Sequence, residues 1–342
     1  MEYRKQSSLI TQTLKNVYFV ETIFFYSNWL PIINGVPQGS ILGPLLFLLF
    51  INDLPNSSNF FNFILFADDS TLSTSLSSLD KSAISRINVE LSHVNSWLTA
   101  NKISINADKT KFITFTYRKK LNFSPLIKIG NNIIKKTDHI KFLGVLVDQN
   151  LNYNHHVNYI SSKISKSIGI LFRLNKYLPI EILRLLYFNL VQPYLTYAIE
   201  SWHSTFTNVT KKVDVLQKRA CRAINKLSFR DHTISYFYNM SILKLNDLFV
   251  LQVASFMYGH LKSNGGNPLS EILITHADSH SYGTRGINQL VAPRYRRKMS
   301  QNCIHFVGVK IWNDLPLDVR VSKSTYSFRK RLKSFLLSRY NV

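Results

Sequence analysis

The sequence predicts an α+β fold, with strands and helices mixed as far as about residue 150 and helices alone beyond it. Two patterns predict this arrangement. Before residue 150, short runs of strand-favouring residues alternate with turn formers, and one amphipathic helix interrupts them. After residue 150, apolar residues recur at helical spacing. The 342 residues are 45% hydrophobic and 13% aromatic, which excludes disorder as the main state of the chain.

The part before residue 150 is expected to hold hairpins and one helix. Residues 62–73 predict two strands joined by a tight turn, because apolar residues flank a run of turn formers. A helix should follow, since apolar residues then recur three and four positions apart at Ile84, Ile87, Leu91, Val94 and Leu98. Ser77 and Asp80 have the spacing of a capping box at its start. Further strands are expected at 103–105, 111–115 and 141–147, with a hairpin at 127–134.

The part after residue 150 is expected to pack helices on one another. Apolar residues share one face in segments 160–171, 180–191 and 213–224. Three residues of this part are expected to be buried in its core: Trp202, Cys221 and Trp312. The adjacent pair His155-His156 is expected at the surface and not in a shared metal site, because neighbours on a helix do not share a face.

The chain is strongly basic. Its 42 Lys and Arg residues against 19 Asp and Glu give a net charge of +23, which indicates a polyanionic partner, either nucleic acid or an anionic membrane surface. Residues 285–342 are the most basic part, and apolar residues at helical spacing within 328–336 predict a helix with a solvated basic face. The wide separation of Cys221 and Cys303 excludes a disulfide scaffold and a zinc site built on cysteine pairs.

The sequence does not favour a membrane partner. The longest apolar run, residues 41–51, is interrupted by Gly43 and Pro44 and is too short to cross a bilayer, so it is expected to be a buried core segment. Residues 1–8 lack the apolar stretch of a secretory signal. The basic residues do not gather on one juxtamembrane segment or on a single amphipathic helix.

Three short segments contain residues suited to phosphate chemistry, and each has a plainer interpretation. Asp68-Asp69 lies in a turn, where two carboxylates can hold divalent metals or simply be solvated. The loop 35–44 has glycines that permit close approach to a ligand, and Gln38 as donor and acceptor, or it only leads into a buried helix. Lys109, just before a strand, can approach a phosphate or face solvent.

Taken together and in this order, these segments resemble the reverse transcriptases of non-LTR (LINE-type) retrotransposons of the arthropod kind. Residues 35–44 resemble motif B of that family, and Phe66-Ala67-Asp68-Asp69 resembles its motif C. Residues 97–115, with Lys109-Thr110-Lys111, resemble motif D, and residues 142–145 resemble motif E. Residues 312–316 and 328–333 resemble the C-terminal end of many such elements.

The resemblance implies an RNA-directed DNA polymerase, a nucleotidyltransferase of a transposable element, with an RNA template and a DNA primer as partners. Residues 1–150 would be a partial right-hand palm with motifs B to E, and residues 151–342 a helical thumb and basic C-terminal region. Intracellular action, in nucleus or cytoplasm, is expected.

The resemblance also assigns roles at the site. Asp68 would bind catalytic Mg²⁺ or Mn²⁺, with Asp69 supporting that site and Lys109 approaching the nucleotide phosphates as a catalytic residue. Four further residues would contact the substrates: Gln38 and Gly39 at the templating base pair, and Phe66 and Ala67 beside the primer terminus and nucleotide sugar.

One part of the family pattern is not found in the sequence. A palm of this kind needs a further aspartate in motif A, upstream of motif B, yet no Asp occurs before Asp53 and the only acidic residues before Gly35 are Glu2 and Glu21. A site without that bridging carboxylate is under-ligated. The expectation is therefore an N-terminally truncated copy, lacking motif A and the fingers and inactive on its own. The alternative is a non-catalytic nucleic-acid-binding remnant.

Overall fold

The computed structural model describes residues 39–116, 125–203, 207–262, 273–279 and 289–340, and the backbone of four two-residue strands before them. These strands pair antiparallel, β1 (Val17–Tyr18) with β4 (Leu30–Pro31) and β2 (Glu21–Thr22) with β3 (Phe25–Tyr26). The chain forms two compact units: Met1–Phe112 with Lys120–Lys136 is the first, and Ile113–Lys119 with Thr137–Val342 is the second. The fold is α+β, as predicted.

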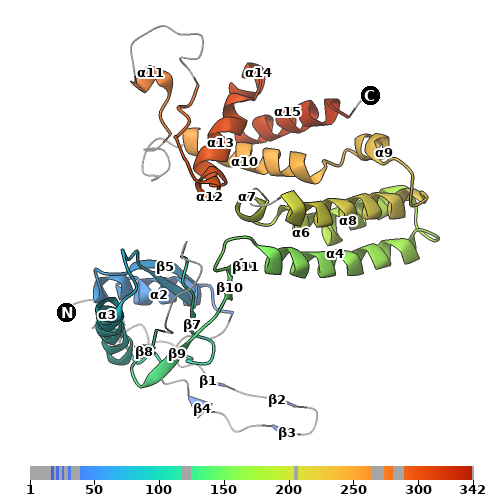
Figure 1. The fold of residues 1–342 in the computed structure, drawn as a ribbon. Coiled ribbons are helices and arrows are strands. Elements are labelled where there is room, and N and C mark those ends of the chain that lie inside the picture. Colours follow the sequence, from blue (N-terminus) through green and yellow to red (C-terminus); the bar gives the residue numbers. More distant parts are fainter. Residues whose placement is uncertain are drawn as a thin grey trace. The chain divides into compact units, whose positions relative to one another are not determined.

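The first unit is built on a hairpin and a long helix (Figure 1). The predicted hairpin is present, with β5 (Asn62–Phe66) antiparallel to β6 (Asp69–Ser73). One face of the hairpin packs on a small core that α3 (Lys81–Ala100) and η1 (Leu54–Ser57) help to form. Its buried members are Ile51, Leu54, Val94 and Leu98. Because strand residues alternate between faces, the opposite face of the hairpin is left in solvent.

Helix α3 confirms the predicted apolar stripe but begins differently from the prediction. Its N-cap is Asp80, whose carboxylate accepts hydrogen bonds from the Ala83 backbone N–H at 2.9 Å and the Ser82 hydroxyl at 2.7 Å. These bonds lower the pKa of Asp80 to about 2, and the bond from the Ala83 N–H has the largest effect. The predicted capping box with Ser77 is therefore wrong, because Asp80 itself holds the extended backbone of an N-cap.

A second small core lies along the same helix. The predicted hairpin at 127–134 is formed by β8 (Ile127–Ile129) and β9 (Asn132–Lys136), and Gly130 at the turn has a φ of 55° that favours glycine. β7 (Lys111–Phe112) pairs parallel with β9. The predicted strand at 103–105 is wrong, although Ile103 and Ile105 pack against the cores of this unit.

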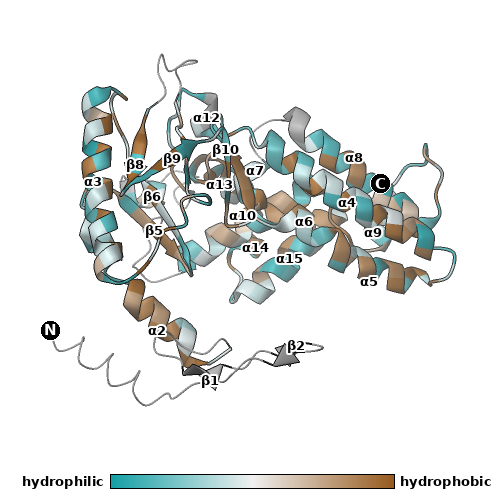
Figure 2. Cartoon of the chain, turned by 90° about the horizontal axis from the view of Figure 1, so that it is seen from below, coloured by the Kyte–Doolittle hydropathy of each residue, from teal (hydrophilic) through white to brown (hydrophobic). Residues whose placement is uncertain are grey.

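Helix α2 (Leu42–Ile51) departs from the sequence-based expectation of a buried segment. Figure 2 shows it as an apolar helix over most of its length. Only Gly43 and Ile51 are buried, while Leu45 and Leu49 are 53% and 67% exposed. The reason is that only the C-terminal end of α2 reaches the core of this unit within the described part of the chain.

From Thr137 onward, the second unit has a hairpin where the sequence pattern predicts one strand. β10 (His139–Phe142) and β11 (Val145–Asp148) pair antiparallel around a turn at Leu143-Gly144, whose φ values are 43° and 86°. The sequence-based division puts these residues before a boundary at 150, whereas their contacts place them with the helices that follow. The segment that resembles motif E, residues 142–145, is therefore the turn of a hairpin and not the middle of a strand.

Helices make up most of the rest of the second unit. The predicted helices are present, and shorter ones join them: α4 (Asn154–Leu174), α5 (Ile180–Leu190), α6 (Gln192–Thr196), α7 (Ile199–Trp202), α8 (Thr207–Asn225), α9 (Ile234–Asn239), α10 (Leu245–Lys262), α11 (His276–Ser279), α12 (Lys298–Gln301), α13 (Ile304–Asn313), α14 (Leu317–Arg320) and α15 (Thr325–Ser338). Apart from the short helices α11 and α12, they share one large core that includes Trp202, Cys221 and Trp312, as predicted. None of the described helices has the length and apolarity needed to cross a membrane.

Candidate functional site

The two adjacent aspartates lie at the tip of the β5–β6 hairpin. In its register Phe66 faces Asp69, so the chain turns through Ala67 and Asp68 alone. Both carboxylates are exposed and neither forms an ion pair with a described residue. Phe66 is 61% exposed beside them, on the face of the hairpin turned away from the core. The tip thus offers two free carboxylates next to an exposed aromatic ring.

The backbone at this tip is strained. Ala67 has a φ of 49°, in the left-handed region that a residue with a Cβ disfavours by about 1–2 kcal/mol. The two-residue turn imposes this conformation, because Phe66 and Asp69 are already paired on either side. Strain of this kind gathers at functional sites, where a fixed orientation of neighbouring side chains is needed.

The loop before α2 is partly described. Gly39 has a φ of 84°, which favours glycine, although a Cβ placed there would meet no atom within 4 Å. Beside it, the Ser40 hydroxyl accepts a hydrogen bond from the Gly43 N–H at 3.0 Å and so holds the start of the helix. Gln38, the other predicted substrate contact in this loop, lies outside the described residues.

Lys109 lies in a tight turn that Asn106 organises. The Lys109 N–H donates to the Asn106 side-chain oxygen at 3.1 Å, and the Thr110 hydroxyl donates to the Asn106 carbonyl at 2.8 Å. The Lys109 side chain is exposed and forms no ion pair with Asp68 or Asp69. Its backbone is therefore fixed while its ammonium group faces solvent.

The second unit carries a basic surface on two packed helices, α4 and α8. Their apolar faces, with Ile164 and Ala220 fully buried, pack in the core. Eight basic residues lie on the two helices: Lys163, Lys166, Arg173, Lys211, Lys212, Lys218, Arg219 and Arg222. Their one acidic residue, Asp214, pairs with Lys218 at 2.7 Å. Most of this positive charge is therefore available to a polyanion.

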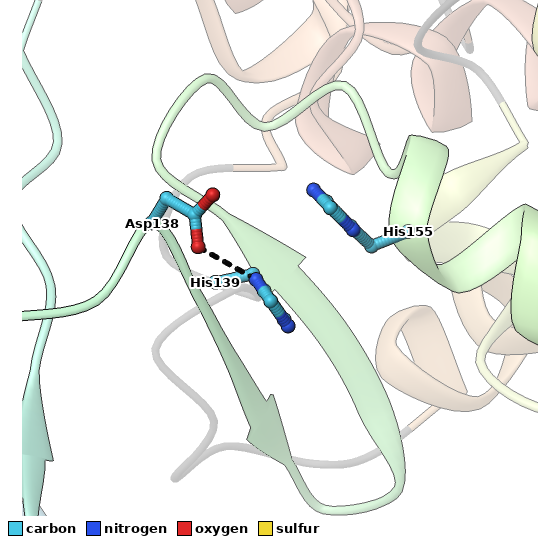
Figure 3. Close-up of side chains that lie close together, drawn as sticks. All are labelled: Asp138, His139 and His155. Carbon is cyan, nitrogen blue, oxygen red and sulfur yellow. Dashed lines mark hydrogen bonds and ion pairs between the residues drawn. The ribbon is translucent and has the colours of Figure 1, made fainter.

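A third group of polar side chains lies in the second unit, and no pattern in the sequence indicates it. Asp138, His139 and His155 each present one ligand atom within 4.8 Å of the others (Figure 3). The Asp138 carboxylate is 2.7 Å from His139 Nδ1, and this hydrogen bond lowers the pKa of Asp138. Among the described residues, no other set of three or more His, Cys, Asp or Glu side chains is placed to hold a metal.

The expectation for the adjacent histidines holds for one of them only. His155 is exposed, but His156 is 2% exposed, with its ring 5.9 Å from that of Trp202. Burial lowers the pKa of His156, whose Nδ1 accepts a 3.4 Å hydrogen bond from the Leu146 N–H. The surface expectation for His156 is wrong because helix α4 turns that side of its first turn toward the core.

Comparison with known proteins finds a match that spans the first unit and the β10–β11 hairpin. Residues 2–147 match the family model described as "Reverse transcriptase (RNA-dependent DNA polymerase)". This range contains Asp68, Asp69 and Lys109, and it ends within β11. Over these residues the chain is therefore similar to reverse transcriptases. No solved structure matches it significantly.

Its relatives are polymerases of mobile elements. The chain is 27% identical over 224 residues to the RNA-directed DNA polymerase from mobile element jockey of Drosophila funebris, covering 62% of this chain and 24% of that protein. It is 28% identical over 198 residues to the probable RNA-directed DNA polymerase from transposon X-element of Drosophila melanogaster, covering 56% and 21%. The match to a retrovirus-related Pol polyprotein from type-1 retrotransposable element R1 of Bradysia coprophila is 29% identical over 143 residues, covering 41% and 14%.

These matches confirm the resemblance to non-LTR retrotransposon reverse transcriptases. The chain aligns with about a quarter or less of the length of these relatives.

Proposed function

We propose that this chain acts in RNA-directed DNA synthesis, with the β5–β6 hairpin as the metal-binding part of a polymerase palm and the α4–α8 helices as its thumb. The observation that carries the proposal is the pair of exposed carboxylates of Asp68 and Asp69. They lie at the strained tip of the hairpin, inside the region that matches the reverse transcriptase family. The chemistry of the neighbouring residues agrees with this role.

The donor set at the hairpin tip suits a hard divalent cation. Mg²⁺ is usually held by one or two carboxylates together with waters and substrate phosphates. Asp68 and Asp69 supply such carboxylates, and neither is occupied by a basic partner among the described residues. Bound there, Mg²⁺ or Mn²⁺ would activate the primer hydroxyl and offset charge on the nucleotide phosphates.

The remaining residues of the site would orient the substrates. The exposed ring of Phe66 and the small side chain of Ala67 leave room for the primer terminus and nucleotide sugar beside the carboxylates. Gln38 and Gly39 would meet the templating base pair, where a residue without a side chain permits close approach. Lys109, held by its turn with its charge in solvent, would approach the nucleotide phosphates.

The basic surface of α4 and α8 would hold the primer–template. An RNA–DNA hybrid presents two phosphate backbones, and lysine and arginine bind them without regard to sequence. Such contacts release counterions, so affinity should fall steeply as salt rises. The scarcity of acidic partners on these helices supports a polyanion as their ligand.

One observation favours a second candidate, a nucleic-acid-binding protein without chemistry. In the described part of the chain, no third acidic, histidine or cysteine side chain joins Asp68 and Asp69. A two-metal site needs more oxygen ligands than two carboxylates alone provide. Under this candidate the α4–α8 surface would still bind nucleic acid, and no nucleotide would be added.

Primer extension distinguishes the two candidates. The purified chain would be given a DNA primer on an RNA template with Mg²⁺ or Mn²⁺, and binding would be measured in parallel by fluorescence anisotropy. Template-dependent extension that Asp68→Asn removes, and Asp53→Asn retains, supports the polymerase and contradicts the expectation that the chain is inactive on its own. Asp53 is a matched control because it is an exposed aspartate of the same unit whose side chain forms no cap hydrogen bond. Binding without extension supports the second candidate, and failure to bind contradicts both.

A further inference from the structure

The cluster of Asp138, His139 and His155 brings together two segments of the second unit. Asp138 and His139 stand at the start of β10, and His155 lies in the first turn of α4 (Figure 3). The two imidazole rings stack with centroids 4.3 Å apart and an angle of 10° between their planes. Asp138 and His155 are exposed and His139 is half-buried, so solutes can reach the three side chains.

The backbone that carries this cluster is fixed by a buried aspartate. Asp148, only 4% exposed, accepts hydrogen bonds from three backbone N–H groups, those of Asn150, Asn152 and Tyr153. The Gln149 N–H donates to the Asp138 carbonyl at 2.9 Å. These bonds hold the end of β11, the start of α4 and the residue before β10 in one rigid turn. The cluster is therefore presented by ordered backbone, as a binding site requires.

From this arrangement we propose that Asp138, His139 and His155 bind one Zn²⁺-type transition-metal ion, which clamps the β10–β11 hairpin to helix α4. Two imidazoles and one carboxylate are ligands that suit Zn²⁺, Ni²⁺ or Co²⁺, whereas Mg²⁺ prefers oxygen alone. Three protein ligands leave a fourth position of a tetrahedral ion for water. This site differs in metal preference from the carboxylates Asp68 and Asp69.

Binding requires a small rearrangement of side chains. Tetrahedral Zn²⁺ with bonds of about 2.0–2.1 Å sets its ligand atoms about 3.3 Å apart. The 2.7 Å contact between Asp138 and His139 must therefore open slightly, while the wider pairs, within 4.8 Å, must close. An ion must also lie in the plane of each ring it binds, so one of the stacked rings must turn. His155, exposed on the helix, is free to make this turn.

The test is metal titration of the full chain with Zn²⁺ and Co²⁺, in the presence of excess Mg²⁺ to occupy oxygen-only sites. His139→Gln and His155→Gln each remove one ligand while leaving a polar side chain of similar length. The matched control is His93→Gln, because His93 is an exposed histidine 3.5 Å from the carboxylate of Glu90. All variants would first be compared by circular dichroism to verify that they fold.

The expected result is one Zn²⁺ per chain, bound at least about tenfold more weakly by His139→Gln and by His155→Gln but not by His93→Gln. Co²⁺ should give the visible absorption of a tetrahedral site, and Zn²⁺ should raise the unfolding temperature of the native chain but not of His155→Gln. Equal binding by the native chain and His155→Gln, or no stoichiometric binding, would overturn the proposal. The cluster would then be a stacked histidine pair with an acidic neighbour.

Discussion

Gln217 and Tyr187 are joined by a hydrogen bond in the centre of the second unit, where both side chains are completely buried. The Gln217 side-chain amide donates to the Tyr187 hydroxyl at 2.9 Å and to the Leu243 carbonyl at 2.9 Å. Its amide oxygen accepts from the Leu245 N–H at 2.9 Å. One residue of α8 thus ties α5 to the start of α10, and burial raises the pKa of Tyr187.

Replacing Gln217 should cost far more stability than removing its tyrosine partner. Gln217→Leu leaves the Leu243 carbonyl and the Leu245 N–H buried without partners, which should lower the free energy of unfolding by about 2–4 kcal/mol. Tyr187→Phe removes a single hydrogen bond and should cost about 1 kcal/mol. Urea unfolding followed by circular dichroism measures both, and equal losses would contradict this description of the core.

Replacing Ala67 by glycine should stabilise the first unit. Glycine adopts the φ of 49° without the strain of about 1–2 kcal/mol, although it adds entropy to the unfolded chain worth about 0.4–1 kcal/mol. The net gain should be about 0.5–1 kcal/mol. Ala83→Gly, in the first turn of α3, is the control and should be destabilising. Limited proteolysis or thermal unfolding would report the difference, and a loss of stability in Ala67→Gly would show that the turn is not strained.

Stability of the second unit should fall as the solution becomes acidic. Burial lowers the pKa of His203 to about 4, against an ordinary value of 6.5 in the unfolded chain. The unfolded state therefore takes up a proton first, so the stabilising contribution of neutral His203 is complete above pH 6.5 and lost as the pH falls toward 4. Within that window this one group contributes a slope of at most about 1.4 kcal/mol per pH unit.

His203→Gln should reduce this slope without abolishing it. Burial also lowers the pKa of His156, so that histidine contributes in the same direction. Urea unfolding of the native chain and of His203→Gln at several pH values between 4 and 7 gives the two slopes. Identical slopes in the two proteins would mean that the pKa of His203 is the same in the folded and the unfolded chain.

Charge reversal on α8 should weaken nucleic-acid binding and its dependence on salt. Lys211→Glu and Arg219→Glu alter exposed residues of the proposed thumb surface. The logarithm of affinity falls linearly with the logarithm of salt concentration. The magnitude of this slope should decrease by about one for each phosphate contact that a variant loses. Lys262→Glu makes the same charge change on another helix, at the C-terminal end of α10, and is the control. Anisotropy titrations at several salt concentrations measure the slopes, and equal effects at Lys262 would indicate a response to net charge only.

Local patterns made much of the fold predictable. The helices at 81–100, 154–174 and 180–190 follow from apolar spacing, which is a property of neighbouring residues. The hairpin that presents Asp68 and Asp69 follows from the turn between two apolar runs. Metal binding at that tip can likewise be predicted from the sequence, because the two carboxylates are adjacent in it.

Features that depend on tertiary placement could not be predicted. Helix α2 is apolar enough for a core, yet its exposure depends on which segments cover it. His139 meets His155 only because the chain reverses at Leu143-Gly144 and again at the turn organised by Asp148. The one sequence signal of that first reversal is the glycine at position 144. Its φ is positive in the structure, a conformation that favours glycine. No spacing rule links the two histidines.

The central claim is that the Asp68–Asp69 tip holds the metal beside the primer end. The most direct measurement is iron-directed cleavage, in which Fe²⁺ replaces Mg²⁺ on the full chain bound to a labelled primer–template and a peroxide pulse cuts nucleic acid near the ion. Cleavage should centre on the primer 3′ end, persist in Asp53→Asn, and disappear from that position in Asp68→Asn. Unchanged cleavage at the primer end in Asp68→Asn would contradict the assignment.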